Sequence, residues 1–144
     1  MGPATGTKTV FMFQDFADRG GPAAVAQRVA RLREVLAARG LDAWLVPHAD
    51  PYQNEFQPAS EERLLWLTGF SGSWGLAVIL PERAVLFVDG RYTLQAGQQT
   101  DRTVFEIIKA PDTKPDEWLA ETLKPGQRLG YDPRLQTIAG ARKL

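Results

Sequence analysis

The sequence contains no cysteine and only one histidine, His48. Without cysteine the chain forms no disulfides and no thiolate metal site. With a single imidazole it cannot build a histidine-rich metal centre, and any serine nucleophile with a histidine base would have to use His48. These absences exclude most catalytic templates from the 144 residues.

Net charge and long apolar runs are also missing. The 17 Lys and Arg residues balance the 17 Asp and Glu residues, so no electrostatic attraction to nucleic acid or to an anionic membrane is expected. No segment approaches the roughly 18 apolar residues of a membrane span, and the first residues lack the pattern of an export signal. We therefore expect a cytoplasmic protein with no nucleic-acid partner and no membrane partner.

The remaining sequence is typical of one domain of the α/β class, since 44% of its residues are hydrophobic. Residues 1–22 are interpreted as an N-terminal arm with one apolar patch that docks, and residues 23–144 as the domain. Apolar periodicity and turn residues predict helices at 22–39, 60–68, 91–99 and 115–124, and strands at 43–46, 74–80, 84–88, 103–109 and 129–131.

Three local patterns refine this prediction. The strand at 43–46 is almost wholly apolar, which favours a strand covered on both faces. The short connection between the strands at 74–80 and 84–88 favours an antiparallel hairpin, so the predicted sheet is mixed and flanked by helices. Ser60 is predicted to cap the second helix, and Thr137 to cap a short helix before the sequence ends.

Polar side chains concentrate in the loop 47–56, which contains an imidazole, carboxylates, amides and a phenol. Three interpretations remain open. The loop is held by its own turns, it contacts a substrate or partner, or it holds a metal through His48, Asp50 and Glu55. The metal is least favoured, because a catalytic divalent site usually takes three protein ligands and Glu55 would have to fold back to supply the third.

The segment 69–75 is rich in glycine and carries Ser71 and Ser73 between a helix and a strand. Its backbone amides can face an anion or allow another chain to approach closely. A phosphate-binding loop is disfavoured, because a strand rather than a helix follows. Neither serine is supplied with a general base by the motif, so both are interpreted mainly as small residues of a tight turn.

The segment Asp89-Gly90-Arg91-Tyr92 follows a predicted strand, where groups that meet ligands usually lie in an α/β sheet. Arg91 offers a planar fork suited to a carboxylate or a carbonyl oxygen, and Asp89 can orient it. The alternative is an ion pair that serves only the domain itself.

Five ordered blocks resemble the N-terminal domain of Xaa-Pro aminopeptidases of the creatinase/prolidase superfamily, over about residues 24–144. The blocks are Leu45-Val46-Pro47, then Asp50 followed by Gln53 and Glu55, then Leu67 to Ser73, then Phe87 to Ala96, and finally Gly130-Tyr131-Asp132-Pro133. Their order and spacing are far more specific than any one block.

The resemblance implies a ribonuclease-H-like mixed α/β domain that precedes a separate catalytic domain of the pita-bread type. That domain, expected downstream, would hold two divalent metal ions, commonly manganese, and cleave the bond before a proline at position two of a peptide. The present chain would then be inactive alone, with no cofactor or metal of its own. It would help to wall the substrate site and to form contacts between the subunits of a homodimer.

Residue by residue, the resemblance assigns substrate contact to Arg91, with Asp89 and Tyr92 beside it. A second group is expected at the substrate or at an interface: Asp50, Gln53, Glu55, Ser71 and Ser73. Two positions depart from the family pattern, because Tyr52 stands where relatives commonly have histidine and Trp74 where they often have a small residue.

Two alternatives remain. One is a stand-alone module of the same fold that binds a protein or peptide. The other is the N-terminal domain of a prolidase or a creatinase. The Gly-Phe-Ser-Gly-Ser and Asp-Gly-Arg-Tyr blocks look more like the aminopeptidase.

Overall fold

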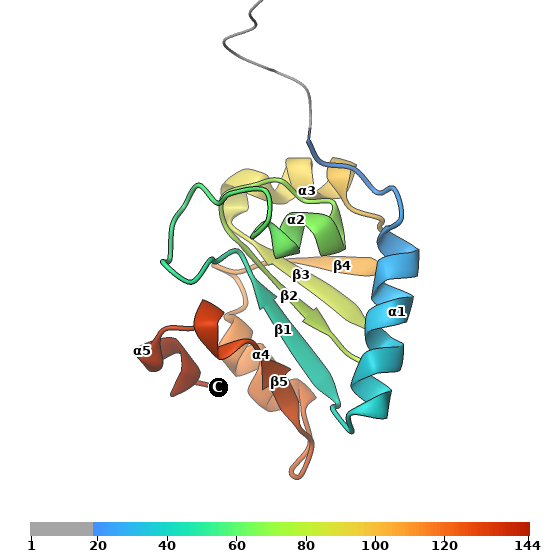
Figure 1. Ribbon diagram of the computed structural model, residues 1–144, viewed down its shortest axis with the longest axis vertical. Coiled ribbons are helices and arrows are strands. Elements are labelled where there is room, and N and C mark those ends of the chain that lie inside the picture. Colours follow the sequence, from blue (N-terminus) through green and yellow to red (C-terminus); the bar gives the residue numbers. More distant parts are fainter. Residues whose placement is uncertain (1–18) are drawn as a thin grey trace, which may run out of the picture.

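The computed structural model describes residues 19–144 and contains one sheet of five strands, in the order β4-β3-β2-β1-β5, with helices on both faces (Figure 1). The strands are β1 (Ala43–Pro47), β2 (Gly75–Ile79), β3 (Ala84–Val88), β4 (Phe105–Lys109) and β5 (Leu129–Tyr131). The α-helices are α1 (Val25–Ala38), α2 (Arg63–Thr68), α3 (Thr93–Gln99), α4 (Pro115–Thr122) and α5 (Ile138–Ala141). Two short 3₁₀ helices, η1 (Gly90–Tyr92) and η2 (Pro133–Leu135), follow β3 and β5.

The predicted mixed sheet is confirmed. Strand β2 is antiparallel to both β1 and β3, whereas β1 pairs with β5 and β3 pairs with β4 in parallel. Strands β1, β3, β4 and β5 therefore run in one direction and β2 runs in the other. As a result β1, β3 and β5 end at the same edge of the sheet at which β2 begins, and we call this the carboxyl edge.

Side chains of the central strands alternate between two hydrophobic cores, as the period of a strand requires. Val46, Ile79 and Leu86 belong to the core that also contains residues of α1 and α2. Leu45 and Phe87 belong to the core on the other face, where Phe87 meets Trp118 of α4 with ring centroids 5.5 Å apart. The prediction that β1 is covered on both faces is thus confirmed for most of its length. The exceptions are Trp44 and the last residue, Pro47, which remain partly exposed.

Three helix ends agree with the local sequence signals that predicted them. Helix α1 stops before Gly40 (φ 63°) and α2 stops at Gly69 (φ 79°), in the left-handed conformation predicted for a helix-terminating glycine. Thr137 caps α5, because its hydroxyl accepts a hydrogen bond from the Gly140 backbone nitrogen at 2.9 Å.

Two helical predictions needed correction. Ser60 does not cap α2, because the chain first turns at 58–61, where the Glu61 nitrogen donates to the Pro58 oxygen at 2.8 Å, and the helix begins only at Arg63. The helix predicted at 91–99 is divided into η1 and α3, since Asp89 caps a separate short turn that starts at Gly90.

The N-terminal arm is described only from Arg19 onward, so the apolar patch predicted to dock, which spans residues 10–16, lies outside the described residues. Within the described part, the Gly21 nitrogen donates to the Gly69 oxygen at 2.9 Å and ties the end of the arm to the end of α2. Among residues 19–144 no helix has the length and apolar character needed to cross a membrane.

Candidate functional site

The carboxyl edge brings together the residues that the sequence singled out. In register, Pro47 of β1 lies opposite Leu76, and Leu76 lies opposite Phe87 of β3. The segments that leave these strands therefore share one edge: the polar loop after β1, the glycine segment before β2, and Asp89 to Tyr92 after β3. Contact of these residues with a substrate stays a prediction.

Asp89 and Arg91 form a compact local unit. Asp89 Oδ1 accepts the Arg91 backbone nitrogen at 2.9 Å and Arg91 Nε at 3.1 Å, so one carboxylate caps η1 and also pairs with the guanidinium. The Arg91 side chain is nevertheless 73% exposed. The Arg91 backbone and side-chain N–H groups hold the pKa of Asp89 below its usual value, and the Asp89 carboxylate raises the pKa of Arg91. The domain thus presents a permanently charged guanidinium that is already oriented.

Tyr92 connects this unit to the glycine segment. Its hydroxyl lies 2.8 Å from Ser73 Oγ, and its ring meets the ring of Phe70 edge-on at a centroid distance of 5.7 Å. On the other side, the Arg91 guanidinium carbon lies 5.3 Å from the Tyr92 ring centroid. Tyr92 therefore fixes the position of Arg91 relative to the start of β2.

Ser71 is bound to Gln99, a buried residue of α3 that sequence reasoning did not single out. Gln99 Oε1 accepts the Ser71 backbone nitrogen at 2.9 Å, and Gln99 Nε2 donates to Ser71 Oγ at 2.9 Å. Gln95, one helical turn earlier, donates to Gln99 Oε1 at 3.2 Å. The signal available in the sequence was the spacing of Gln95 and Gln99. Residues four positions apart share a helix face, so the predicted helix presents both amides on one side.

The glycine segment owes its composition to close packing. A Cβ atom at Gly72 would lie 2.2 Å from the ring of Phe70, and one at Gly69 would lie 2.1 Å from the Gly21 carbonyl oxygen. These contacts fit a tight turn. No phosphate-binding geometry is needed to explain the glycines.

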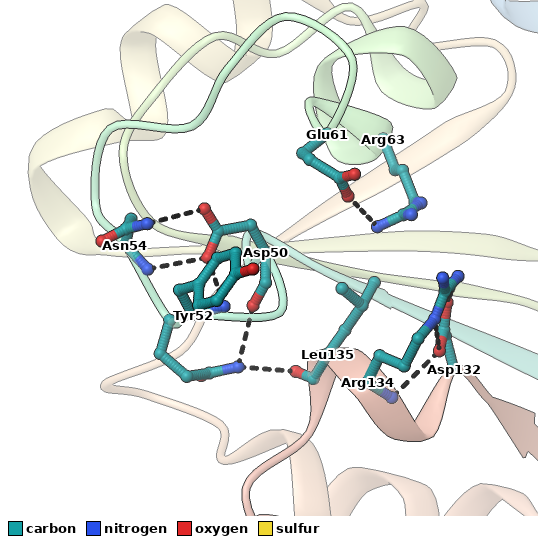
Figure 2. A network of polar contacts seen from close by, with 9 residues as sticks. Asp50, Tyr52, Asn54, Glu61, Arg63, Asp132, Arg134 and Leu135 are labelled. Carbon is teal, nitrogen blue, oxygen red and sulfur yellow. Dashed lines mark hydrogen bonds and ion pairs between the residues drawn. The ribbon is translucent and has the colours of Figure 1, made fainter.

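Asp50 organises the polar loop (Figure 2). Its side chain is buried and accepts hydrogen bonds from the Tyr52 nitrogen at 2.9 Å, the Asn54 nitrogen at 3.0 Å and Asn54 Nδ2 at 2.9 Å. These donors, with the Asn54 backbone first among them, hold the pKa of Asp50 below its ordinary value. Asp50 is therefore a charged centre around which the loop folds, in agreement with the interpretation of a loop held by its own turns.

The metal interpretation of this loop does not fit the structure. His48 Nε2 donates to the Glu55 carbonyl oxygen at 2.9 Å, so the Glu55 backbone rather than its carboxylate meets the imidazole. Among the residues that the structure describes, no group of three or more His, Cys, Asp or Glu side chains is arranged to hold a metal ion.

Gln53 ties the loop to η2, which follows the neighbouring strand β5. Its amide donates to the carbonyl oxygens of Asp50 at 3.3 Å and of Leu135, in η2, at 3.2 Å. Glu55 is exposed, and its charge contributes to the raised pKa of Arg91. The loop thus faces Arg91 at one end and η2 at the other.

Aromatic side chains give this edge an apolar surface. Tyr52 is 84% exposed, Phe56 86% and Trp74 42%. Phe56 was not singled out from the sequence. The available signal was an aromatic residue within a polar loop, where a large apolar side chain has no core to pack into.

A second Asp-X-Arg unit follows β5 and was also missed. Asp132 Oδ1 accepts the Arg134 nitrogen at 3.0 Å, and Asp132 Oδ2 accepts Arg134 Nη2 at 2.8 Å, which repeats the arrangement of Asp89 and Arg91 (Figure 2). The signal was the repetition itself, because both units come directly after a strand.

The family follows from the comparison with known proteins. Residues 28–144 match the Creatinase/Prolidase N-terminal domain. The chain belongs to this family. A probable Xaa-Pro aminopeptidase P of Paracoccidioides brasiliensis (strain Pb03) is 40% identical over 121 residues, which cover 83% of this chain and 20% of that protein. A probable Xaa-Pro aminopeptidase P of Coccidioides posadasii (strain C735) is 38% identical over 125 residues, covering 85% of this chain and 19% of that protein.

Solved structures of this family share the fold. The X-prolyl aminopeptidase of Caenorhabditis elegans, described as a cytosolic enzyme with a di-nuclear active site, superposes with a TM-score of 0.76 at 33% identity, over 83% of this chain and 22% of that chain. The isolated N-terminal domain of the cytoplasmic peptidase PepQ of Mycobacterium tuberculosis superposes with a TM-score of 0.59 at 29% identity, over 81% of each chain. This creatinase-family chain spans about a fifth of the length of the curated aminopeptidases it matches.

Proposed function

We propose that this chain is the non-catalytic N-terminal domain of a metal-dependent Xaa-Pro aminopeptidase and that its carboxyl edge borders the substrate site. One observation carries the proposal. The chain matches aminopeptidases over 83% of its own length but only 20% of theirs. The chemistry is therefore assigned to the part of those proteins that this chain does not match.

In this proposal Arg91 is the substrate-binding residue, and Asp89 and Tyr92 hold it in place. A guanidinium with free N–H groups binds a peptide carbonyl or carboxylate, and a preformed partner lowers the entropy lost on binding. Asp50, Ser71 and Ser73 stabilise the two segments beside Arg91. Gln53 and Glu55, with the exposed Tyr52 and Phe56, form the surface that meets the substrate or a neighbouring subunit.

Metal ions enter the proposal only through the remainder of the protein. The donor set described here does not fit them, since residues 19–144 bring no three metal-ligating side chains together. In an enzyme of this type a pair of divalent ions, manganese in our proposal, supplies the hydrolytic chemistry. The present domain contributes binding and shape.

The proposed substrate is a peptide with proline at position two, and the proposed assembly is a homodimer. A cytosolic location is proposed because the enzyme of Caenorhabditis elegans is described as cytosolic. Prolidase and creatinase remain less favoured members of the same superfamily, because the named relatives above 35% identity are aminopeptidases.

The first experiment reads the coding sequence beyond Leu144 and expresses the complete protein. We expect it to release the first residue from Ala-Pro-Phe but not from Ala-Ala-Phe, and to lose this activity with a metal chelator. The 144-residue chain, assayed in parallel with added manganese, is expected to be inactive. Cleavage by the chain alone, or equal cleavage of both peptides by the complete protein, would overturn the proposal.

A stand-alone binding module is the second candidate, favoured by the exposure of Tyr52 (84%) and Phe56 (86%). A reading frame that stops after Leu144 would support it. In that case Tyr52→Ser and Phe56→Ser are expected to abolish partner binding without unfolding the domain.

A further inference from the structure

A cavity of about 340 Å³ lies between α1, β1, α2 and η2, on the face of the sheet that carries α1 and α2. Its position explains why Trp44 of β1 remains partly exposed although the neighbouring strand residues are buried. The cavity is distinct from the site around Arg91, because neither Arg91 nor any residue of the glycine segment lines it.

The walls of the cavity are apolar and aromatic. Trp44 of β1 and Trp66 of α2 line it, together with Leu32 and Val35 of α1. Trp66 is 58% exposed and Val35 is 38% exposed, so neither is covered by packing within the described part of the domain. A volume of this size lies at the lower end of the roughly 300–1,000 Å³ of small-molecule sites, which are mostly apolar with a few polar groups.

The charged groups around the cavity are unbalanced toward positive charge. Arg28, Arg31 and Arg63 line it, against the single carboxylate of Asp132. Asp132 is paired with Arg134 at 2.8 Å, which neutralises it (Figure 2). Arg31 and Arg63 have carboxylate partners of their own, Glu34 at 2.6 Å and Glu61 at 2.7 Å.

Among the described residues, the partners of Arg28 differ from those of Arg31 and Arg63, the other two arginines that line the cavity. Its guanidinium carbon lies 4.9 Å from the centroid of the Trp66 ring, and its Nη1 donates to the Trp66 carbonyl oxygen. It is thus held by a ring and a carbonyl rather than by a carboxylate. A guanidinium carries five N–H donors, so Arg28 keeps both its charge and donors for a bound anion.

We propose that this cavity binds a small apolar carboxylate, an aromatic or branched aliphatic acid. The apolar body packs against Trp44, Trp66 and Val35, and the carboxylate pairs with Arg28. Charge complementarity selects an anion over a neutral compound of the same shape, because a hydrogen bond between two charged groups is stronger than one to a neutral group. The inference does not depend on the proposed aminopeptidase function.

The test uses the 144-residue chain, because the N-terminal domain of PepQ, which has the same fold, was crystallised without the rest of its protein. The probe is 4-phenylbutyrate, and the neutral comparison is 4-phenylbutyramide. Binding is followed by NMR at the indole N–H groups of the four tryptophans. We expect saturable shifts at Trp44 and Trp66 and none at Trp118, which lies in the opposite core. The acid is expected to bind about tenfold more tightly than the amide.

Variants test separately how the charge of Arg28 and the shape of the cavity contribute to binding. Arg28→Gln is expected to remove the preference for the acid while leaving the amide bound as before. The matched control is Arg33→Gln on the same helix, whose Nε donates to the Leu80 oxygen at 2.9 Å, away from the cavity. Val35→Trp is expected to fill the space and to abolish binding of both compounds.

Four results would overturn the inference. They are equal affinity for acid and amide, shifts at Trp118, the same loss of binding in Arg33→Gln as in Arg28→Gln, and saturable binding by the 144-residue chain that disappears in the complete protein. The last result would mean that another segment of the protein occupies the cavity. All of these outcomes are independent of peptide cleavage, so they leave the proposed aminopeptidase function to its own test.

Discussion

The hydroxyl groups of Ser73 and Tyr92 lie 2.8 Å apart and join the segment that enters β2 to the turn that leaves β3. Because the Tyr92 ring also contacts Phe70 and the Arg91 guanidinium, this single hydrogen bond lies between the buried core and the exposed cation. The bond therefore helps to set where Arg91 is presented.

Removing this bond should cost little stability but change the position of Arg91. Tyr92→Phe keeps the ring and is expected to lower the free energy of unfolding by about 1 kcal/mol. Ser73→Ala should have a similar effect, and the double variant should lose little more than either single one, because the two hydroxyls act on each other. Urea unfolding curves of the four proteins measure the coupling. Strict additivity would contradict the hydrogen bond.

Substituting Gly69 should be far more damaging than substituting a glycine of similar conformation elsewhere. Gly69 (φ 79°) and Gly126 (φ 89°) both adopt the left-handed region, but only Gly69 has backbone atoms where a Cβ would be. Gly126→Ala is expected to cost about 1–2 kcal/mol from the conformation alone. Gly69→Ala adds a clash with the Gly21 and Gln99 carbonyl oxygens, which are 2.1 Å and 2.7 Å from the Cβ position. Thermal unfolding of both variants gives the comparison, and equal losses would show that the arm does not pack there.

The polar loop should weaken in acid. The pKa of Asp50 is held below its ordinary value of 3.8, so its contribution to stability is fully present above that pH and is lost as the pH falls through the lower folded pKa. The difference in stability between the wild type and Asp50→Asn is therefore expected to shrink in acid. Asn54→Ala, which removes one donor to the carboxylate, should raise the pKa of Asp50. Carboxyl ¹³C NMR titration measures the pKa of Asp50 in the wild type and in Asn54→Ala. A pKa of Asp50 at or above 3.8 in the wild type would contradict the prediction.

The two Asp-X-Arg units allow a controlled test of Arg91. For the complete protein, the proposed function predicts that Arg91→Ala lowers kcat/KM for Xaa-Pro peptides about tenfold or more, through loss of a charge-assisted contact. Arg134→Ala removes a guanidinium from the same local geometry at β5 and should leave kcat/KM nearly unchanged. Steady-state kinetics on both variants separate substrate contact from capping. Equal decreases in kcat/KM for the two variants would mean that Arg91 only stabilises the domain and does not contact the substrate.

The sequence predicted those features of the fold that depend on neighbouring residues. The apolar run of β1, the hairpin of β2 and β3, and the glycines that end α1 and α2 all carry their signal within a few positions. Family resemblance added the identity of the domain, because ordered blocks report on the whole fold rather than on one element.

Features that depend on distant contacts could not be predicted in this way. Gln99 reaches Ser71 across 28 positions, and Gln53 reaches Leu135 across 82. In both pairs, the sequence around one residue does not indicate which distant residue it contacts. The partial exposure of Trp44 is of the same kind, since it depends on how far α1 and α2 extend over the sheet. The roles given to Arg91 and the polar loop in substrate binding remain predictions.

The pairing of β5 with β1 also has a consequence for the order of folding. The residues that join these strands are far apart in the chain, as shown by Asp42 and Arg128, whose hydrogen bond spans 86 positions. Strands β2 and β3 can pair as soon as their short turn forms, whereas closing so long a loop is slow. During synthesis, the outer edge of β1 thus waits on the order of ten seconds for its partner strand. Through that interval an unpaired strand edge is exposed to other chains, and the three-residue β5 is what finally closes it.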